Sequence, residues 1–171
     1  MTIEEFKIEV LPIKNKLYRL ALRLLGSQAD AEDAVQEVFL KLWARREKLN
    51  EYRSIEAFAM IITKNLCFDK LKLKSRNQQE LTEERVGSKQ DTPETQMEMK
   101  NTVSKIHEII NELPEQQKLV IQLRDIEQCD FDEIAEITNM NLNTIRVNLS
   151  RARKKVRDTL LKIQNYEFSS N

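Results

Sequence analysis

The stretch from Phe131 to Leu161 carries the pattern that most constrains how this chain can fold. In its second half, apolar residues recur at steps of three and four, which places them on one face of an α-helix. These residues are Ile145, Leu149, Ala152, Val156 and Leu160. A neighbouring stripe is made of Arg146, Ser150, Arg153 and Arg157, flanked by Arg151, Lys154 and Lys155. A basic stripe beside an apolar one is typical of a helix that enters a DNA groove.

A shorter helix precedes this one, with Phe131, Ile134, Ala135 and Ile137 as its apolar side. Asp130 or Asp132 is suited to cap its start. The break between the helices holds no Gly, but Asn139 can adopt the left-handed conformation that such a turn needs. Asn141 then suits the N-cap of the second helix, with Thr144 near its third position. The pattern predicts a helix-turn-helix. The alternative is an ordinary helical hairpin whose basic face is only solvated.

Composition favours an all-α protein of one domain or two small ones, because 33% of the 171 residues are charged and Gly and Pro are scarce. The start, MTIEEFKIEV, mixes charge into every turn, and no apolar run approaches the length of a membrane span. We therefore expect a cytoplasmic protein without membrane insertion. Cys67 and Cys129 stand alone without metal-ligand spacing, so we expect reduced thiols, no metal and no cofactor.

The net charge of zero hides strong segregation along the chain. Residues 141–163 hold seven Lys or Arg against one Asp, whereas residues 101–140 hold three basic and nine acidic residues. Residues 51–76 hold six basic against three acidic, and residues 77–100 hold three against six. Because phosphate contact depends on the local field, the two basic segments remain candidates for binding nucleic acid.

The front of the chain predicts two helices. The first covers residues 6–25 and has a periodic apolar face of Ile8, Leu11, Leu17, Leu20, Ala21, Leu24 and Leu25. Pro12 is expected as a first-turn residue or a kink, and Gly26 as the C-terminal cap. Ser27 begins a second helix with Ala31, Val35, Val38, Phe39 and Leu42 inward. Its remaining surface carries Asp30, Asp33, Gln36, Glu37, Leu40 and Trp43. Such a surface fits the docking of another helix, although a plain scaffold helix with Trp43 in the core fits as well.

A polar break at 50–54 leads into a long helix through Arg76, whose expected buried positions are Ile55, Phe58, Ile61, Ile62, Leu66 and Leu71. Its polar surface is mainly basic and carries Lys64, Asn65, Asp69, Lys70, Lys72, Lys74 and Arg76. Lys and Arg neutralise phosphates, and Asn can bond a base edge. Tyr52 and Phe58 could stack on an unpaired base. The alternative is that Tyr52 lies on the loop surface and Phe58 in the core.

The chain then loses its apolar period and turns acidic, which predicts a flexible linker over 77–100 between domains at 1–76 and 101–171. The second domain opens with a helix through Val103, Ile106, Ile109, Ile110 and Leu113. A further helix, EQQKLVIQLRDIE, leads to the helix-turn-helix. The lone His107 has no partner motif.

Four runs stand in an order that resembles bacterial sigma factors of the extracytoplasmic-function (ECF) branch. They are DAEDAVQEVFLKLW at 30–43, ITKNLCFDKLK at 62–72, LPEQQKLVIQLRDIE at 113–127 and DFDEIAEITNMNLNTIRVNLSRARKKV at 130–156. The resemblance implies a non-enzymatic subunit of RNA polymerase with sigma region 2 in its first domain and region 4 in its second. It would direct promoter-specific initiation by recognising two promoter elements and helping to melt the DNA.

The resemblance also implies partners and residue roles. Helix 30–43 would bind the clamp helices of the largest polymerase subunit through Asp30, Asp33, Gln36, Glu37, Leu40 and Trp43. Minus-10 DNA would contact Asn50, Tyr52, Arg53, Phe58, Lys64, Asn65, Asp69 and Lys72. Minus-35 DNA would contact Asn143, Thr144, Arg146, Val147, Ser150, Arg151, Arg153 and Lys154. Further expected partners are the flap of the second-largest subunit and an anti-sigma factor, with a monomer when the protein is free.

The sequence departs from the family pattern at Phe58, where Trp is most frequent, and at Gln128 and Asn143, which replace frequent glycines. The ring of Phe58 should preserve melting, and the other two changes should affect only turn detail. Two alternatives remain open. One is a dimeric regulator that binds a palindrome, and the other is a helical enzyme or phosphorelay module that uses His107.

Overall fold

The computed structural model describes residues 1–80 and 101–169, and all regular structure within these ranges is helical. The front helices are α1 (Ile3–Glu9), the 3-10 turn η1 (Leu11–Ile13), α2 (Lys14–Leu25), α3 (Gln28–Ala44), the 3-10 turn η2 (Arg46–Glu51) and α4 (Ile55–Glu80). The rear helices are α5 (Thr102–Asn111), α6 (Glu115–Ile121), the π-helical turn η4 (Gln122–Ile126), α7 (Phe131–Thr138) and α8 (Leu142–Ser169). The all-α prediction is confirmed, and most of the predicted linker lies outside the described residues.

The break between α7 and α8 forms as the sequence predicts. Asn139 has φ 59°, in the left-handed region, and its backbone N–H bonds the carbonyl of Ala135 to close α7. The side chain of Asn141 accepts a hydrogen bond of 2.8 Å from the backbone N–H of Thr144. Asp130, not Asp132, caps the start of α7. These local bonds satisfy helix-end groups that have no partner within a helix, so they fix the helix-turn-helix from short-range chemistry alone.

The helical segment expected over residues 6–25 is interrupted at Pro12, where the sequence left open a kink. The chain forms α1 and α2 with η1 between them, and Pro12 lies within this 3-10 turn. Proline lacks the N–H that a continuous helix needs, so the register restarts after it. Ile8 and Leu11, which we expected in the core, are 72% and 47% exposed, whereas Phe6 and Val10 are buried. Gly26 ends α2 with φ 72°, as predicted.

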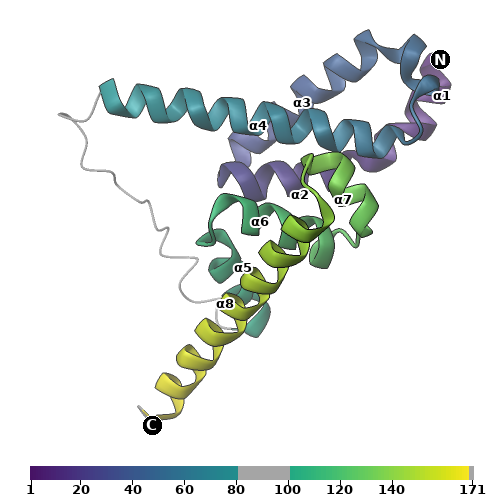
Figure 1. Ribbon diagram of the computed structural model, residues 1–171. Helices are drawn as coiled ribbons and strands as arrows, with labels where there is room; N and C mark the ends of the chain where they lie inside the picture. Colours follow the sequence, from purple (N-terminus) through teal and green to yellow (C-terminus); the bar gives the residue numbers. More distant parts are fainter. Residues whose placement is uncertain (81–100, 170–171) are drawn as a thin grey trace.

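Helix α4 is buried on more sides than its sequence suggests. Of the six positions expected inside, only Leu66 is fully buried, and the other five are half-buried. Fully buried positions instead include Ala57, Ala59, Met60, Thr63 and Cys67. The cause is that α4 packs against α2 and α3 and also against α7 (Figure 1). Because its contacts lie on opposite sides, burial along α4 has little helical period.

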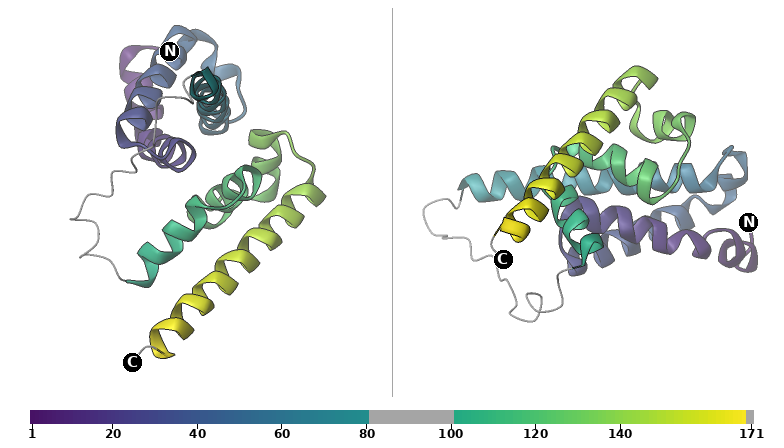
Figure 2. Two further views of the ribbon diagram at one scale, coloured as in Figure 1. Left: turned by 90° about the vertical axis from the view of Figure 1, so that its left-hand side faces the viewer. Right: turned by 90° about the horizontal axis from the view of Figure 1, so that it is seen from below.

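The front and rear helices pack together around one continuous hydrophobic core. Figures 1 and 2 show α1 to α4 as one group and α5 to α8 as a second group lying against it, with α8 projecting beyond both. The projecting end carries the exposed rings of Tyr166 and Phe168. Over residues 1–80 and 101–169, no helix combines the length and apolar character that crossing a membrane requires.

Candidate nucleic-acid interface

Helix α8 turns its predicted apolar face inward. Ile145, Leu149 and Ala152 are buried, and Val156 and Leu160 are half-buried. Most residues of the predicted minus-35 set lie on the exposed side, namely Asn143, Arg146, Val147, Ser150, Arg151, Arg153 and Lys154, while Thr144 is half-buried at the capped start. Because the helix-turn-helix packs through its apolar face, the basic side is left free to approach a phosphate backbone or a base edge.

Arg146 shares an aromatic ring with a second arginine. Its guanidinium carbon lies 5.6 Å from the centroid of the Phe131 ring, and that of Arg124 lies 4.6 Å from the same centroid. Arg124 also donates a hydrogen bond of 2.9 Å to the carbonyl of Cys129. Cation–π contact with the half-buried ring restricts where the Arg146 head can lie. Phe131 looked like an ordinary core position in the sequence, and Arg124 had no assigned role.

Arg153 is engaged within the protein. Its Nε and Nη2 atoms donate to the two carboxylate oxygens of Asp125, at 3.0 and 2.6 Å. The hydrogen bond to Asp125 raises the pKa of Arg153, since the pair favours the charged guanidinium. Arg153 therefore has to leave a bidentate partner before it can bind DNA, unlike its exposed neighbour Lys154. No signal in the sequence distinguished these two positions.

The predicted minus-10 residues fall into two clusters, and the first lies where η2 leads into α4. The rings of Tyr52 and Phe58 stack there, with centroids 3.9 Å apart and an interplanar angle of 14°. The guanidinium carbon of Arg45 lies 6.0 Å from the Phe58 ring centroid. Asn50 and Arg53 are exposed beside this pair. The arrangement joins an aromatic platform to nearby cations, which suits an unpaired nucleotide.

The second cluster lies along α4, where Asn65, Asp69 and Lys72 are exposed and Lys64 is half-buried. These four residues line a surface hollow whose opposite wall includes Glu115 of α6. The Nζ atom of Lys64 donates a hydrogen bond of 2.9 Å to the carbonyl of Ile137, at the end of α7. Burial lowers the pKa of Lys64. Part of the predicted minus-10 surface is therefore covered by the rear helices.

The outer face of α3 remains accessible. Asp30, Asp33, Gln36 and Leu40 are exposed, and Leu40 reaches 70%. Glu37 is half-buried and pairs with Lys70 of α4 at 3.4 Å. Trp43 packs edge-to-face on Phe6, with centroids 5.1 Å apart. An apolar surface groove runs beside this face, lined by Phe6, Leu11, Tyr18, Val35, Phe39, Leu40 and Trp43 together with Lys14, Glu32 and Gln36. Exposed acids beside an apolar groove fit the docking surface expected from the sequence.

Neither cysteine has the features of a reactive or metal-binding thiol. Burial raises the pKa of Cys67 to about 12 and that of Cys129 to about 11, so both remain protonated at neutral pH. Both are free thiols. In the described part of the chain, no three His, Cys, Asp or Glu side chains come together in a way that could hold a metal ion.

Two family models match separate parts of the chain. Sigma-70 region 2 matches residues 11–77, and sigma-70 region 4 matches residues 104–156. The RNA polymerase sigma factor SigV of Bacillus subtilis is 33% identical over 149 residues, which cover 87% of each chain. The ECF RNA polymerase sigma factor SigW of the same organism is 28% identical over 161 residues, covering 86% of this chain and 84% of SigW.

A third relative, the ECF RNA polymerase sigma factor SigE of Mycolicibacterium smegmatis, is 30% identical over 151 residues, which are 86% of this chain and 58% of SigE. The solved structure of the sigma factor RpoE in complex with the anti-sigma factor NepR, from Bartonella quintana, has the same fold. It superposes with a TM-score of 0.78 at 24% identity, covering 94% of this chain and 99% of RpoE.

A front unit that matches region 2, followed by a helix-turn-helix that matches region 4, defines an RNA polymerase sigma factor. Within that class, the chain belongs to the ECF family. It acts in promoter recognition and transcription initiation with RNA polymerase. The family predicted from the sequence is confirmed.

Proposed function

We propose the following division of work within this sigma factor. Residues 1–76 bind polymerase and open the minus-10 element, residues 101–171 bind the minus-35 element, and residues 77–100 join the two domains. The observation that carries this proposal is the separation of two unlike surfaces. The basic face of α8 suits duplex DNA, whereas the stacked Tyr52–Phe58 pair beside cations suits an unpaired strand.

At the minus-35 element, α8 lies in the major groove and its basic side carries the contacts. Arg146, Val147, Ser150 and Arg151 approach the base edges, and Asn143, Thr144, Arg153 and Lys154 position the helix on phosphates. Arg146 is the best candidate to specify a base, because a guanidinium bonds guanine O6 and N7 together. Val147 and Ser150 offer only apolar or single contacts, so their base preference stays unassigned.

At the minus-10 element, the Tyr52–Phe58 platform receives an unstacked base while Asn50 and Arg53 hold the adjoining backbone. Lys64, Asn65, Asp69 and Lys72 continue this surface along α4. No bond in the DNA is broken by the protein, so the residues need only offset an unpairing cost of about a few kcal/mol. This is why we assign the protein no enzymatic activity of its own.

Polymerase docks on the outer face of α3. Asp30, Asp33, Gln36, Glu37, Leu40 and Trp43 contact the clamp helices of the largest subunit, and the rear helices contact the flap of the second-largest subunit. We expect the protein to act in the cytoplasm, where polymerase acts, and to be a monomer until it binds. The solved relative in complex with NepR supports an anti-sigma factor as a further partner.

Transcription in vitro with core polymerase on a promoter library tests this division. The Arg146→Ala variant should lose ~1–3 kcal/mol of discrimination at one minus-35 position and little elsewhere. The matched control is Lys162→Ala, which removes an exposed cation of α8 outside the proposed contacts. An equal loss on every promoter would make Arg146 a phosphate contact, and no loss would remove Arg146 from minus-35 recognition.

A further inference from the structure

A polar hollow of about 340 Å³ lies between α2 and the start of the rear helices. Its polar lining consists of Arg19 and Arg23 from α2, His107 and Asn111 from α5, and Gln122 from η4. None of the residues assigned above to promoter DNA or to the α3 docking face lines it. Pockets that bind small molecules usually measure roughly 300–1,000 Å³, so this hollow has room for a small ligand.

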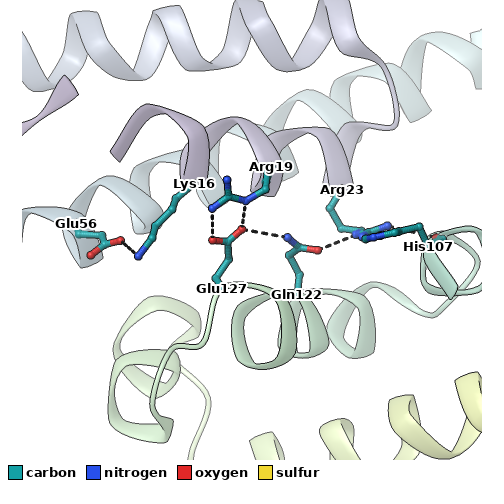
Figure 3. Close-up of polar contacts among 7 residues, drawn as sticks. All are labelled: Lys16, Arg19, Arg23, Glu56, His107, Gln122 and Glu127. Carbon is teal, nitrogen blue, oxygen red and sulfur yellow. Dashed lines mark hydrogen bonds and ion pairs between the residues drawn. The ribbon is translucent and has the colours of Figure 1, made fainter. Parts of the chain in front are cut away.

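The guanidinium of Arg23 is held only by uncharged groups (Figure 3). Its Nε atom donates to Oε1 of Gln122 at 2.8 Å, and its Nη1 atom donates to Oδ1 of Asn111 at 2.6 Å. Its Nη2 atom lies 2.6 Å from Nδ1 of His107, and Nη1 also donates to the backbone carbonyl of His107 at 3.3 Å. Over residues 1–80 and 101–169, Arg23 has no carboxylate partner.

The charge of Arg23 is therefore not balanced, in contrast to that of Arg19. Nε and Nη2 of Arg19 donate to the two carboxylate oxygens of Glu127 at 2.6 and 2.7 Å, and the hydrogen bond to Glu127 raises the pKa of Arg19. Burial lowers the pKa of Arg23, because desolvation disfavours the charged form. A guanidinium nevertheless stays charged in proteins, and a buried charge without a counter-charge is unfavourable.

The side-chain groups that remain without a partner around this hollow are hydrogen-bond donors. An arginine cannot accept a hydrogen bond, so Nδ1 of His107 accepts from Arg23 and the ring proton lies on Nε2. The oxygens of Asn111 and Gln122 also accept from Arg23. The remaining donors are Nε2 of His107, Nδ2 of Asn111 and Nη1 of Arg19, which have no partner in the described part of the chain. An anion with several oxygens matches both these donors and the unbalanced charge.

We propose that this hollow binds a small molecule through a phosphate group. A phosphate monoester carries a charge of about −1.5 to −2 at neutral pH and has three acceptor oxygens. It can therefore balance Arg23 and accept from several of the free donors at once, whereas a carboxylate offers only two oxygens and one charge. Leu22 and Ile126 also line the hollow and provide apolar surface for the carbon part of an organic phosphate.

Titration calorimetry on the full chain in phosphate-free buffer tests the site with inorganic phosphate and with glycerol 3-phosphate. Each should bind once per chain and raise the melting temperature, because a ligand of the folded state stabilises it by mass action. Tighter binding of glycerol 3-phosphate would identify an organic phosphate as the ligand, and equal binding would identify free phosphate. Binding of neither compound, or equally tight binding of acetate, would overturn the proposal. Displacement of phosphate by a short DNA strand with hydroxyl ends would assign the hollow to nucleic acid instead.

The variant Asn111→Asp places a carboxylate where Arg23 has none. Asn111 is exposed, and aspartate has nearly the same shape and keeps an oxygen for Nη1 of Arg23, so the variant should fold. It removes the Nδ2 donor and repels an incoming anion. Its dissociation constant for inorganic phosphate should therefore rise ~10-fold, the loss of one hydrogen bond to a charged group. Without phosphate it should melt at a higher temperature than wild type, because the charge of Arg23 is then balanced.

Asn165→Asp is the matched control, since it makes the same change at an exposed position of α8 that does not line the hollow. It should alter neither the phosphate affinity nor the melting temperature. Unchanged phosphate affinity for Asn111→Asp would overturn the site. An equal loss for both variants would overturn it as well, because net charge alone would then govern binding. A lower melting temperature for Asn111→Asp without phosphate would contradict the unbalanced charge on which the proposal rests.

Discussion

The Arg146 guanidinium lies over the ring of Phe131, with 5.6 Å between its central carbon and the ring centroid. The guanidinium carbon of Arg124 lies 4.6 Å from the same ring centroid, and Arg124 also donates a hydrogen bond to the carbonyl of Cys129. A flexible arginine loses rotamer entropy when it binds a base, and a ring that already restricts the guanidinium reduces this cost. Phe131 is therefore a positioning residue for the proposed minus-35 contact of Arg146.

Replacing Phe131 with Leu should preserve most apolar packing and remove the cation–π contact. We expect ~0.5–1 kcal/mol less discrimination at the base read by Arg146, the size of an exposed cation–π contact. Transcription from promoters substituted at each minus-35 position measures this loss. Phe168→Leu, at an 83% exposed ring near the end of α8, is the control. Unchanged discrimination by Phe131→Leu would show that the ring does not position Arg146.

Replacing Asp33 with Lys should abolish co-purification with core polymerase while the protein remains folded. Asp33 is exposed on α3, so the change disturbs no buried contact, and the melting temperature should stay close to wild type. Glu37 is a less clean test on its own because it also pairs with Lys70. The double change Asp33→Lys/Glu37→Lys should have the same effect on polymerase binding. Normal co-purification of a folded Asp33→Lys protein would contradict the docking assignment.

Removing the Tyr52 ring should impair promoter opening more than promoter binding. Tyr52→Ala removes half of the stacked pair, and a lost base–aromatic stack costs ~1–3 kcal/mol. Transcription should fall on a duplex promoter and recover on a template whose minus-10 region is already mismatched and open. Tyr52→Phe keeps the ring and serves as the control. Equal defects on both templates would mean that Tyr52 acts outside DNA melting.

Local chemistry explains which parts of the fold could be predicted. The helix-turn-helix follows from an apolar period and from the caps at Asn139 and Asn141, all within a few residues of one another. The division of the first predicted helix at Pro12 stayed open in the sequence, because a proline near a helix start is compatible with either outcome. The burial pattern of α4 could not be predicted, because α7 supplies one of its packing surfaces from a distant part of the chain.

In the candidate sites too, contacts between distant parts of the chain could not be predicted. Exposed stripes on α3 and α8 are visible as helical periods, and the structure places most of those residues on the surface. The pairing of Arg19 with Glu127 joins residues 108 positions apart, and that of Arg153 with Asp125 joins residues 28 apart. Neither has a spacing that a single helix would reveal. The one available signal for the first of these pairings (Figure 3) was a pair of arginines, Arg19 and Arg23, four residues apart on α2.

The stability that His107 adds to the packing of α2 against the rear helices should decline as the pH falls. Its Nδ1 atom lies 2.6 Å from Nη2 of Arg23, so a neutral imidazole can accept that hydrogen bond and an imidazolium cannot. Burial, and then the charge of Arg23, lower the pKa of His107 below its ordinary value of 6.5. The charged groups lining its hollow are Arg23 and Arg19, and Arg19 is already paired with Glu127.

The direction of this pH dependence follows from the difference in the pKa of His107 between the folded and the unfolded protein. Because the pKa of His107 is lower in the folded protein than in the unfolded chain, this contribution is fully present above pH 6.5 and is lost as the pH falls below it. Chemical unfolding between pH 8 and about 5 should show wild type losing stability relative to His107→Gln. Glutamine offers an acceptor but does not titrate. The difference between the two proteins therefore reports His107 alone, because their carboxylates titrate in the same way. Parallel pH profiles for the two proteins would mean that the contact between His107 and Arg23 does not contribute to stability.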